Sequence, residues 1–178
     1  MFQMGENLPC FVSDNYVCKN TLPLSKFNPK QYKLLVAVGG SKDRKHLVDN
    51  LPPSTQFFTF IHPTAIVSQF YGMLLGEGSF IGAHSVITTN IKLGKHTLLN
   101  RGNHIGHDSV IGDYFSAMPG AIVSGNVTIG NNVYMGTNSS VKEKINITDN
   151  VIIGLNSGVI KDITQEGIYV GTPSKKVK

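Results

Sequence analysis

Apolar residues recur at every sixth position through the second half of the chain, from residue 75 to residue 159. Steps of eighteen residues separate the members of three interleaved apolar series. These are Leu75, Leu93, Ile111, Ile129 and Ile147; Ile81, Leu99, Ala117, Met135 and Ile153; and Ile87, Ile105, Val123, Val141 and Val159. An amphipathic helix would repeat its apolar residues every three or four positions instead. The period of six therefore argues against a helix and indicates an internal repeat.

A second regular feature is a small or apolar residue four positions after each apolar residue of these series. Examples are Ser79, Ser85, Thr97, Ser109, Ala121, Val133, Ser139, Val151 and Ser157. Six residues suffice for one short strand and one tight corner, and three such units close a triangular coil whose neighbours share an aliphatic core. Glycine and asparagine suit the corners because they tolerate unusual backbone angles. We therefore predict a mostly β fold, a parallel β-helix over residues 61–178, in preference to a β-sandwich with regular turns.

Residues 1–60 follow a different pattern. The segments CFVSDN, KLLVAVGG and QFFTFIHP are typical of buried strands, and SKDRKHLVDNL is typical of a helix that Ser41 opens. Strands that alternate with a helix predict a small parallel α/β subdomain over residues 1–60. After the repeats, GIYVGTPSKKVK is predicted to be an extended tail that ends in solvent.

Composition and charge narrow the classes of function. The chain of 178 residues is 40% hydrophobic, as expected for a globular domain, and contains no apolar run long enough to span a membrane. Its start lacks the features of a signal peptide, and its two cysteines are interpreted as ordinary thiols, so we expect a cytoplasmic protein without membrane contact. The net charge of +5 comes from scattered residues without a nucleic-acid-binding motif. It fits small ligands that carry phosphates better than nucleic acid.

Four segments carry a family resemblance: IHPTAIVS, GHDSVIGD, SGNVTIG and YVGTPSKK. Together with the α/β segment, they resemble the NeuD/PglD-like sugar acetyltransferases, whose fold is a left-handed parallel β-helix of hexapeptide repeats. The resemblance implies a homotrimeric enzyme that transfers acetyl from acetyl-CoA to the amino group of a nucleotide-linked 4-amino-4,6-dideoxy sugar. UDP is the favoured nucleotide, with dTDP and GDP open. The chain departs from the family in lacking the usual first strand and glycine-rich loop, which leaves a truncated, Rossmann-like subdomain.

His107 is the candidate general base. Acetyl transfer to an amine needs a group that takes a proton from the attacking nitrogen and a donor for the oxyanion. Histidine titrates near neutral pH, and His107 occupies the third position of its hexapeptide, which points outward near a corner. Taken alone, the sequence favours a surface histidine with a neighbouring acid, and only the family resemblance favours a catalytic role. The resemblance implies that His107 is the base, that Asp108 supports it, and that the backbone amide of Gly125 holds the acetyl carbonyl.

The resemblance also implies residues for both substrates. For coenzyme A, Thr137 and Leu155 would line the pantetheine arm, and Pro173 and Lys175 would lie by the adenine and phosphates. For the acceptor, Asn100 corresponds to a position near the amine, and Ser116 stands where better-known members carry a second histidine. Candidates for the nucleotide are Ser13, Asp14, Gly39, Gly40 and Arg44, because glycines between a strand and a helix start suit a diphosphate.

Three alternatives remain. The first is O-acetylation of a sugar or sialic acid by the same residues, and the second is a non-catalytic β-helix scaffold. The third, a γ-type carbonic anhydrase, uses zinc held by three histidines, two of them five residues apart on one coil. His104 and His107 are three residues apart, so no metal is expected. His84 and His96 are interpreted as solvated surface residues, and His104 as a polar corner residue.

Overall fold

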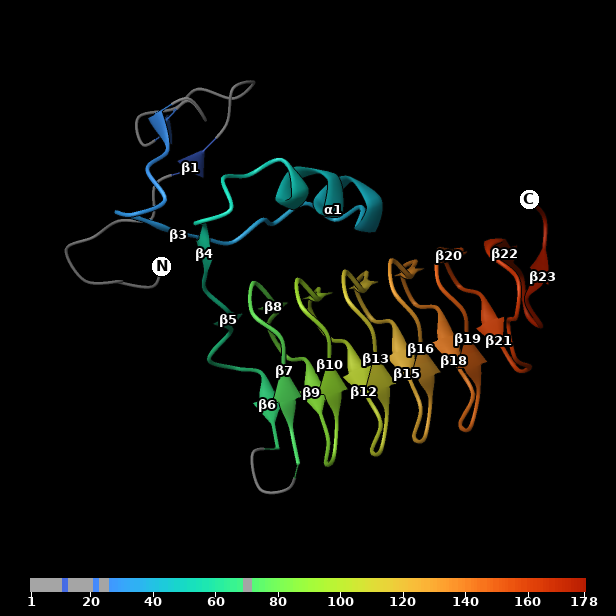
Figure 1. Ribbon diagram of the computed structural model, residues 1–178. Coiled ribbons are helices and arrows are strands. Elements are labelled where there is room, and N and C mark those ends of the chain that lie inside the picture. The colour runs from blue at the N-terminus through green and yellow to red at the C-terminus, as the bar shows by residue number, and fades with distance from the viewer. Residues whose placement is uncertain (1–10, 13–20, 23–25, 69–71) are drawn as a thin grey trace. The chain divides into compact units, whose positions relative to one another are not determined.

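The structure is a computed structural model that describes residues 11–12, 21–22, 26–68 and 72–178. Contacts between residues group the chain into two units, residues 1–33 with 52–56, and residues 34–51 with 57–178. In the first unit, β1 (Phe11–Val12) and β2 (Thr21–Leu22) pair in parallel. The second unit contains the helix α1 (Ser41–Asp49) and all the coils (Figure 1). The helix thus groups with the coils, whereas the sequence places it in an α/β subdomain over residues 1–60.

Three sheets run along the stacked coils of the second unit, and their strands are parallel except for the last strand of the third sheet. The first comprises β7 (Leu74–Leu75), β10 (Lys92–Leu93), β13 (Val110–Ile111), β16 (Thr128–Ile129) and β19 (Asn146–Ile147). The second comprises β6 (Ile66–Val67), β9 (Val86–Ile87), β12 (His104–Ile105), β15 (Ile122–Val123), β18 (Ser140–Val141) and β21 (Gly158–Val159). The third comprises β5 (Phe60–Ile61), β8 (Phe80–Ile81), β11 (Leu98–Leu99), β14 (Ser116–Ala117), β17 (Tyr134–Met135), β20 (Val151–Ile153), β22 (Gly167–Val170) and β23 (Lys175–Lys176).

The register of these sheets is the eighteen-residue step of the sequence. Leu93 pairs with Leu75 and Ile111, and Ile105 pairs with Ile87 and Val123. Of the fifteen residues in the three apolar series, all but Leu75 are buried, and Leu75 packs against the same core. The predicted left-handed parallel β-helix of hexapeptide repeats is therefore confirmed, because the strands that carry these fifteen residues place them in the core shared by the stacked coils.

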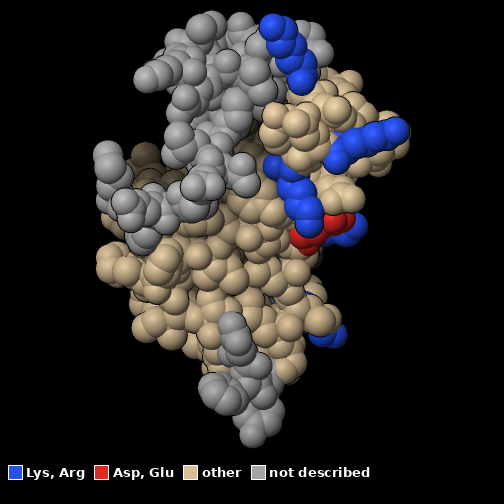
Figure 2. All heavy atoms as spheres, turned by 90° about the vertical axis from the view of Figure 1, so that its left-hand side faces the viewer, with Lys and Arg blue, Asp and Glu red and all other residues tan. Residues whose placement is uncertain are grey.

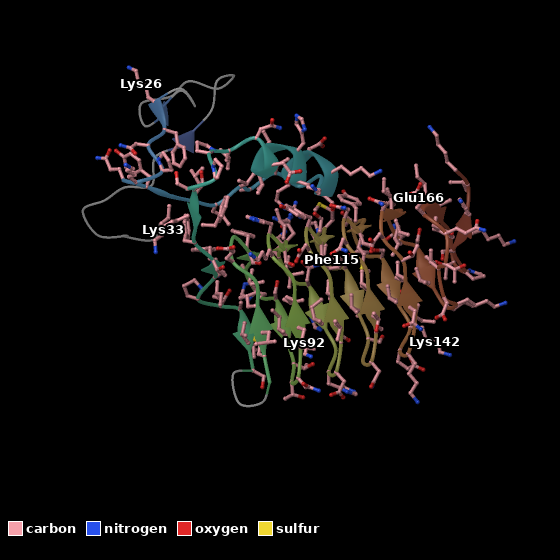
Figure 3. The ribbon with its side chains drawn as sticks, viewed as in Figure 1. Lys26, Lys33, Lys92, Phe115, Lys142 and Glu166 are labelled. Carbon is pink, nitrogen blue, oxygen red and sulfur yellow. The ribbon has the colours of Figure 1, made fainter. Side chains whose placement is uncertain are left out.

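The small residues at the fifth position link neighbouring coils. Ser85 Oγ donates to the carbonyl of Asn100 at 2.9 Å, and Ser109 Oγ donates to the carbonyl of Ser124 at 3.2 Å. Phe115 is the aromatic exception at this position, and its ring is fully buried inside the coil (Figure 3). The hydroxyls satisfy backbone carbonyls that the short strands leave unpaired, which a buried polar group requires.

The corners explain the polar residues of the repeat. Every sixth residue from 72 to 156 has a positive φ, in the left-handed region that most side chains disfavour. These residues are Gly72, Gly78, His84, Asn90, His96, Gly102, Asp108, Tyr114, Gly120, Asn126, Asn132, Asn138, Lys144, Asn150 and Asn156. Glycine, asparagine and aspartate predominate because they adopt this conformation at the lowest cost. The corner residues thus stack in three columns, one along each edge of the coil.

The segments outside the coils differ in part from prediction. Strand structure in KLLVAVGG is limited to β3 (Lys33–Leu34), which pairs with β4 (Gln56–Phe57). The carbonyls of Val38 and Gly39 instead accept from Arg44, so these residues do not form a sheet ladder. The helix is confirmed, but Gly40 is its N-cap and Ser41 makes no capping bond. The tail folds back, because β23 pairs antiparallel with β22.

Candidate active site

His107 and Asp108 lie at the corner between the β12 and β13 strands. His107 Nδ1 is 2.7 Å from Asp108 Oδ2, and both side chains are exposed. An ionised carboxylate can only accept hydrogen bonds, so Nδ1 is the donor and carries the proton. The lone pair of Nε2 is then free to accept another proton. The pair therefore presents an oriented base at the surface of the coil.

Asp108 is held from its other side as well. Asn90 Nδ2 donates to Asp108 Oδ1 at 2.7 Å, one coil below. The hydrogen bond from Asn90, together with that from His107, holds the pKa of Asp108 below its ordinary value. Asp108 therefore stays ionised at neutral pH. Sequence reasoning missed Asn90, although its position eighteen residues before Asp108 is a signal that the repeat makes available.

Gly125 lies next to the His107 ring, on the following coil. A Cβ atom at Gly125 would lie 2.7 Å from His107 Nε2 and 2.8 Å from Cε1, closer than real Cβ contacts allow. Any other residue would push the imidazole aside. Within the described chain, the Gly125 N–H has no hydrogen-bond acceptor. The structure therefore brings two of the predicted residues together, a ring nitrogen that can accept a proton and a backbone donor.

The predicted coenzyme and acceptor residues lie along a different edge of the coil. Thr137 and Leu155 are exposed on adjacent coils, at the corner between the β17 and β18 strands and the one above it. Leu155 has 70% of its surface exposed. Asn100 follows β11 at this same edge, where its Oδ1 accepts from the Arg101 N–H at 2.8 Å. Within one chain, these three residues and His107 belong to separate edges.

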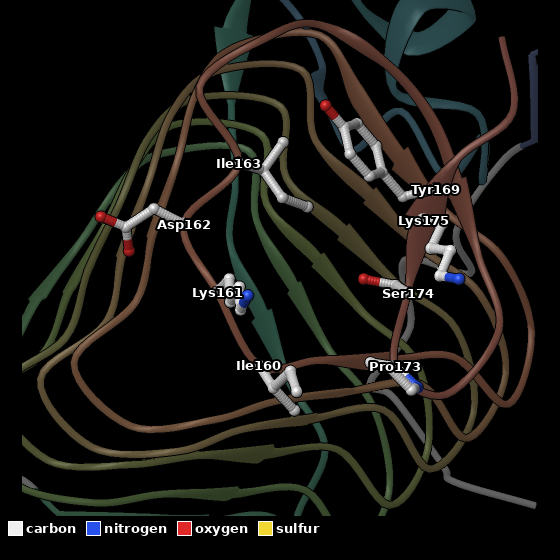
Figure 4. Close-up of a pocket in the computed structure, with 8 residues that line it drawn as sticks. All are labelled: Ile160, Lys161, Asp162, Ile163, Tyr169, Pro173, Ser174 and Lys175. Atoms are coloured by element: carbon white, nitrogen blue, oxygen red, sulfur yellow. The ribbon is translucent and has the colours of Figure 1, made fainter.

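Pro173 and Lys175 line a pocket of about 350 Å³ at the end of the coils (Figure 4). The other lining residues are Ile160, Lys161, Asp162, Ile163, Tyr169 and Ser174. Lys161 and Lys175 supply two positive charges beside apolar side chains, a combination that fits a phosphate next to a flat ring. Sequence reasoning named Pro173 and Lys175 but missed Lys161.

Arg44 and Ser116 do not support their predicted substrate contacts. Arg44 is 1% exposed, and its guanidinium donates to the carbonyls of Val38, Gly39, His96, Tyr114 and Phe115. It also donates to Ser116 Oγ at 2.8 Å, and Ser116 is itself fully buried. Burial lowers the pKa of Arg44 to about 10. These two side chains instead attach α1 to the coils. The guanidinium nitrogens of Arg44 already donate to groups of the protein and so are not available to a substrate.

The remaining nucleotide candidates are placed less favourably or lie outside the described residues. The Asp43 carboxylate lies against Gly40, so a carboxylate already stands at the start of α1. A Cβ atom added at Gly39 would lie 3.7 Å from Met118 Cε, so this glycine already has a side chain packed beside it. Ser13 and Asp14 fall outside the described residues.

His96 and His104 also differ from prediction. His96 is 3% exposed, not solvated, and lies between Tyr114, stacked at 5.1 Å, and Phe57, edge-on at 4.6 Å. His104 belongs to β12 rather than to a corner, although it is exposed as expected. Phe57 lies outside the repeat and Tyr114 lies one coil away, so the hexapeptide pattern did not reveal the burial of His96.

Comparison with known proteins places this geometry in context. No protein-family model matches the chain. GDP-perosamine N-acetyltransferase from Escherichia coli O157:H7 is 30% identical over 111 residues, which are 62% of this chain and 49% of that protein. The chain thus spans about half the length of this curated relative.

Two solved structures extend the comparison. The first is PerB from Caulobacter crescentus in complex with CoA and GDP-perosamine (26% identity, TM-score 0.77, 82% of this chain and 70% of that one). The second is the acetyltransferase domain of PglB from Neisseria gonorrhoeae in complex with acetyl coenzyme A (25% identity, TM-score 0.85, 94% and 85%).

In sequence and in fold, the chain is therefore similar to hexapeptide-repeat sugar acetyltransferases. Three further observations concern the described residues. Among the described residues, no group of three or more His, Cys, Asp or Glu side chains could hold a metal ion. None of its described helices is long and apolar enough to cross a membrane. In the view of Figure 2, lysine and arginine side chains lie in separate groups along one edge and leave much of the described surface uncharged.

Proposed function

We propose that this chain transfers an acetyl group from acetyl-CoA to the amino group of a nucleotide-linked 4-amino-4,6-dideoxy sugar. The observation that carries the proposal is that the His107 ring lies against Gly125 on the next coil, whose N–H has no acceptor among the described residues. The relatives support it, since one is named a GDP-perosamine N-acetyltransferase and another is described with CoA and GDP-perosamine. The sequence favoured UDP; these names make a GDP-linked sugar the first acceptor to test.

The reaction follows from the positions of the two groups. The neutral amine attacks the thioester carbonyl of acetyl-CoA while His107 Nε2 accepts a proton from the nitrogen, and a C–N bond forms. The carbonyl oxygen becomes an oxyanion to which the Gly125 N–H donates. When the tetrahedral intermediate collapses, the C–S bond breaks and the thiolate of coenzyme A leaves and takes up a proton. Asp108 stays ionised and stabilises the imidazolium that forms in between.

A homotrimer completes the proposed site. His107 lies at one edge of the coil, whereas Asn100, Thr137 and Leu155 lie at another. A single acceptor–coenzyme pair can contact both edges only if a neighbouring copy supplies one of them. Three copies around an axis would pair each His107 edge with the coenzyme edge of the next copy, and heterologous contacts of this kind close into rings. The Pro173 and Lys175 pocket would then hold the adenine end of coenzyme A.

The decisive experiment is an assay of acceptors with acetyl-CoA, read by mass spectrometry. GDP-, UDP- and dTDP-linked 4-amino sugars are each tested beside the corresponding 4-hydroxy sugar. We expect one acetyl group to be added to an amino sugar and none to its hydroxy counterpart. Addition to the hydroxy sugar instead would establish O-acetylation. No product with any acceptor, together with no rise in melting temperature on adding acetyl-CoA, would leave the scaffold alternative.

A further inference from the structure

The corner column below His107 contains a side chain that the proposed chemistry does not yet use. Asn90 has a positive φ of 53° and directly precedes Asp108 in this column. A Cβ atom at Gly72, the next corner down, would lie 2.9 Å from Asn90 Oδ1. The amide is therefore confined on one side by backbone and hydrogen-bonded on the other, through Nδ2 to Asp108 Oδ1.

Asp108 is fixed by two donors, one on each carboxylate oxygen. Asn90 Nδ2 and His107 Nδ1 each lie 2.7 Å from their oxygen. An exposed carboxylate with only one partner would rotate and exchange that partner for water, which weakens its hold on the ring. With both oxygens occupied, the plane of the carboxylate is set, and so is the orientation of the imidazole. Asn90, Asp108 and His107 thus form a chain of hydrogen bonds that ends at the His107 ring, which lies beside Gly125.

We propose that Asn90 is a positioning residue, which orients Asp108 so that His107 keeps its proton on Nδ1 and presents Nε2 beside Gly125. This inference rests on the proposed acetyl transfer for its catalytic consequence. The corner conformation favours glycine, asparagine or aspartate. Of these three, glycine has no side chain to donate and an ionised aspartate only accepts, so asparagine alone meets both requirements.

The test uses Asn90→Gly, which keeps the corner conformation easy and removes the donor. We expect kcat to fall about tenfold, the order expected for a lost hydrogen bond to a charged group, with the KM for acetyl-CoA unchanged. Asn90→Asp keeps the shape but places a second carboxylate against Asp108, and should lose a similar factor. Asn132→Gly is the matched control, because Asn132 also has a positive φ but lies in another column; its kcat should match the wild type.

A second measurement needs no acceptor. The ¹⁵N chemical shifts of His107, assigned by comparison with His107→Gln, report which ring nitrogen carries the proton. We expect the Nδ1–H form to predominate in the wild type and in Asn132→Gly, and a mixture of both forms in the two Asn90 variants. An unchanged tautomer together with kcat within about twofold of wild type would overturn the proposal. A tautomer change in a protein inactive on every acceptor would refute the proposed function and leave the positioning role standing.

Discussion

At the scale of single residues, the candidate chemistry depends on one ring nitrogen, Nε2 of His107. Its partner Asp108 remains ionised well into the acid range, because the hydrogen bonds from Asn90 and His107 lower the pKa of this carboxyl. Protonation of Asp108 therefore does not limit activity near neutral pH. The chemistry requires the neutral form of the imidazole, because a protonated ring cannot accept the proton of the amine.

Replacement of His107 by glutamine should lower kcat by about 10²–10⁴, the usual contribution of a general base. The melting temperature should stay unchanged, since the His107 side chain is exposed. The measurement is kcat at one fixed pH, with His104→Gln as control because His104 is exposed on the neighbouring strand. A His107→Gln variant that retained more than about a third of the wild-type kcat would contradict the assignment.

The sequence predicted three residues of the candidate site but not Asn90. His107, Asp108 and Gly125 lie in short motifs that can be recognised from residues adjacent in the sequence. Asn90 contacts Asp108 only because the coil returns after eighteen residues, so its role becomes visible once the register is known. Arg44 and Ser116 misled sequence reasoning because burial, which decides what a polar side chain contacts, is a property of the packed helix and coil together.

At the scale of elements, α1 is attached to the coils by Arg44, a buried cation that has no hydrogen-bonded carboxylate among the described residues. Arg44 donates to five backbone carbonyls and to Ser116 Oγ, and Ser41 Oγ donates to Ser116 Oγ at 3.0 Å. Hydrogen bonds from a charged group are worth more than neutral ones, and a planar guanidinium can make several at once.

Arg44→Met should lower the free energy of unfolding by about 3 kcal/mol, because it leaves several buried acceptors without a donor. Arg44→Lys should recover little of this loss, since one ammonium cannot reach the same set of carbonyls. Denaturant unfolding measures both. Lys42→Ala, at an exposed position of the same helix, serves as the control and should change stability little. Equal stabilities of Arg44→Met and wild type would show that α1 is held by other contacts.

His96 makes the stability of this region depend on pH. Burial lowers the pKa of His96 below its ordinary value of 6.5, an effect that Glu77 and Asp113 oppose and Arg44 and Lys95 reinforce. As the pH falls below this value, the unfolded chain takes up a proton that the folded protein resists. The contribution of His96 to stability is therefore complete above pH 6.5 and is lost as the pH falls through the lowered pKa.

The wild type should consequently lose more melting temperature between about pH 7.5 and about pH 5 than His96→Asn does. Asparagine suits the test because it has no titrating group and tolerates the positive φ of 53° at this corner. Thermal unfolding at both pH values gives the comparison. His84→Asn, at an exposed corner with a similar φ, should keep the pH dependence of the wild type. Parallel losses in wild type and His96→Asn would exclude His96 as the cause.

At the scale of the whole molecule, the separation of two functional edges is the feature with the largest consequence. The hexapeptide pattern predicts how the coils of one chain stack, but it does not specify contacts between copies, so the trimer has to be measured. Light scattering should give about three times the chain mass of 19.3 kDa. Coexpressed His107→Gln and Thr137→Trp chains should regain activity that each lacks alone, because mixed trimers contain sites in which both edges are intact. A fully active monomer would contradict this arrangement.

Because of the eighteen-residue register, each turn of the coil rises by one strand spacing, about 4.8 Å. A whole turn added above Gly125 would lengthen the coil and leave Asn90, Asp108 and Gly125 on the same edge. An insertion of six residues between His107 and Gly125 would rotate everything that follows it by a third of a turn and move the glycine to another edge of the coil. Chain length can therefore change in whole turns outside residues 90–125. A whole turn inserted between His107 and Gly125 would keep the glycine on its edge but move it one strand spacing, about 4.8 Å, away from the imidazole.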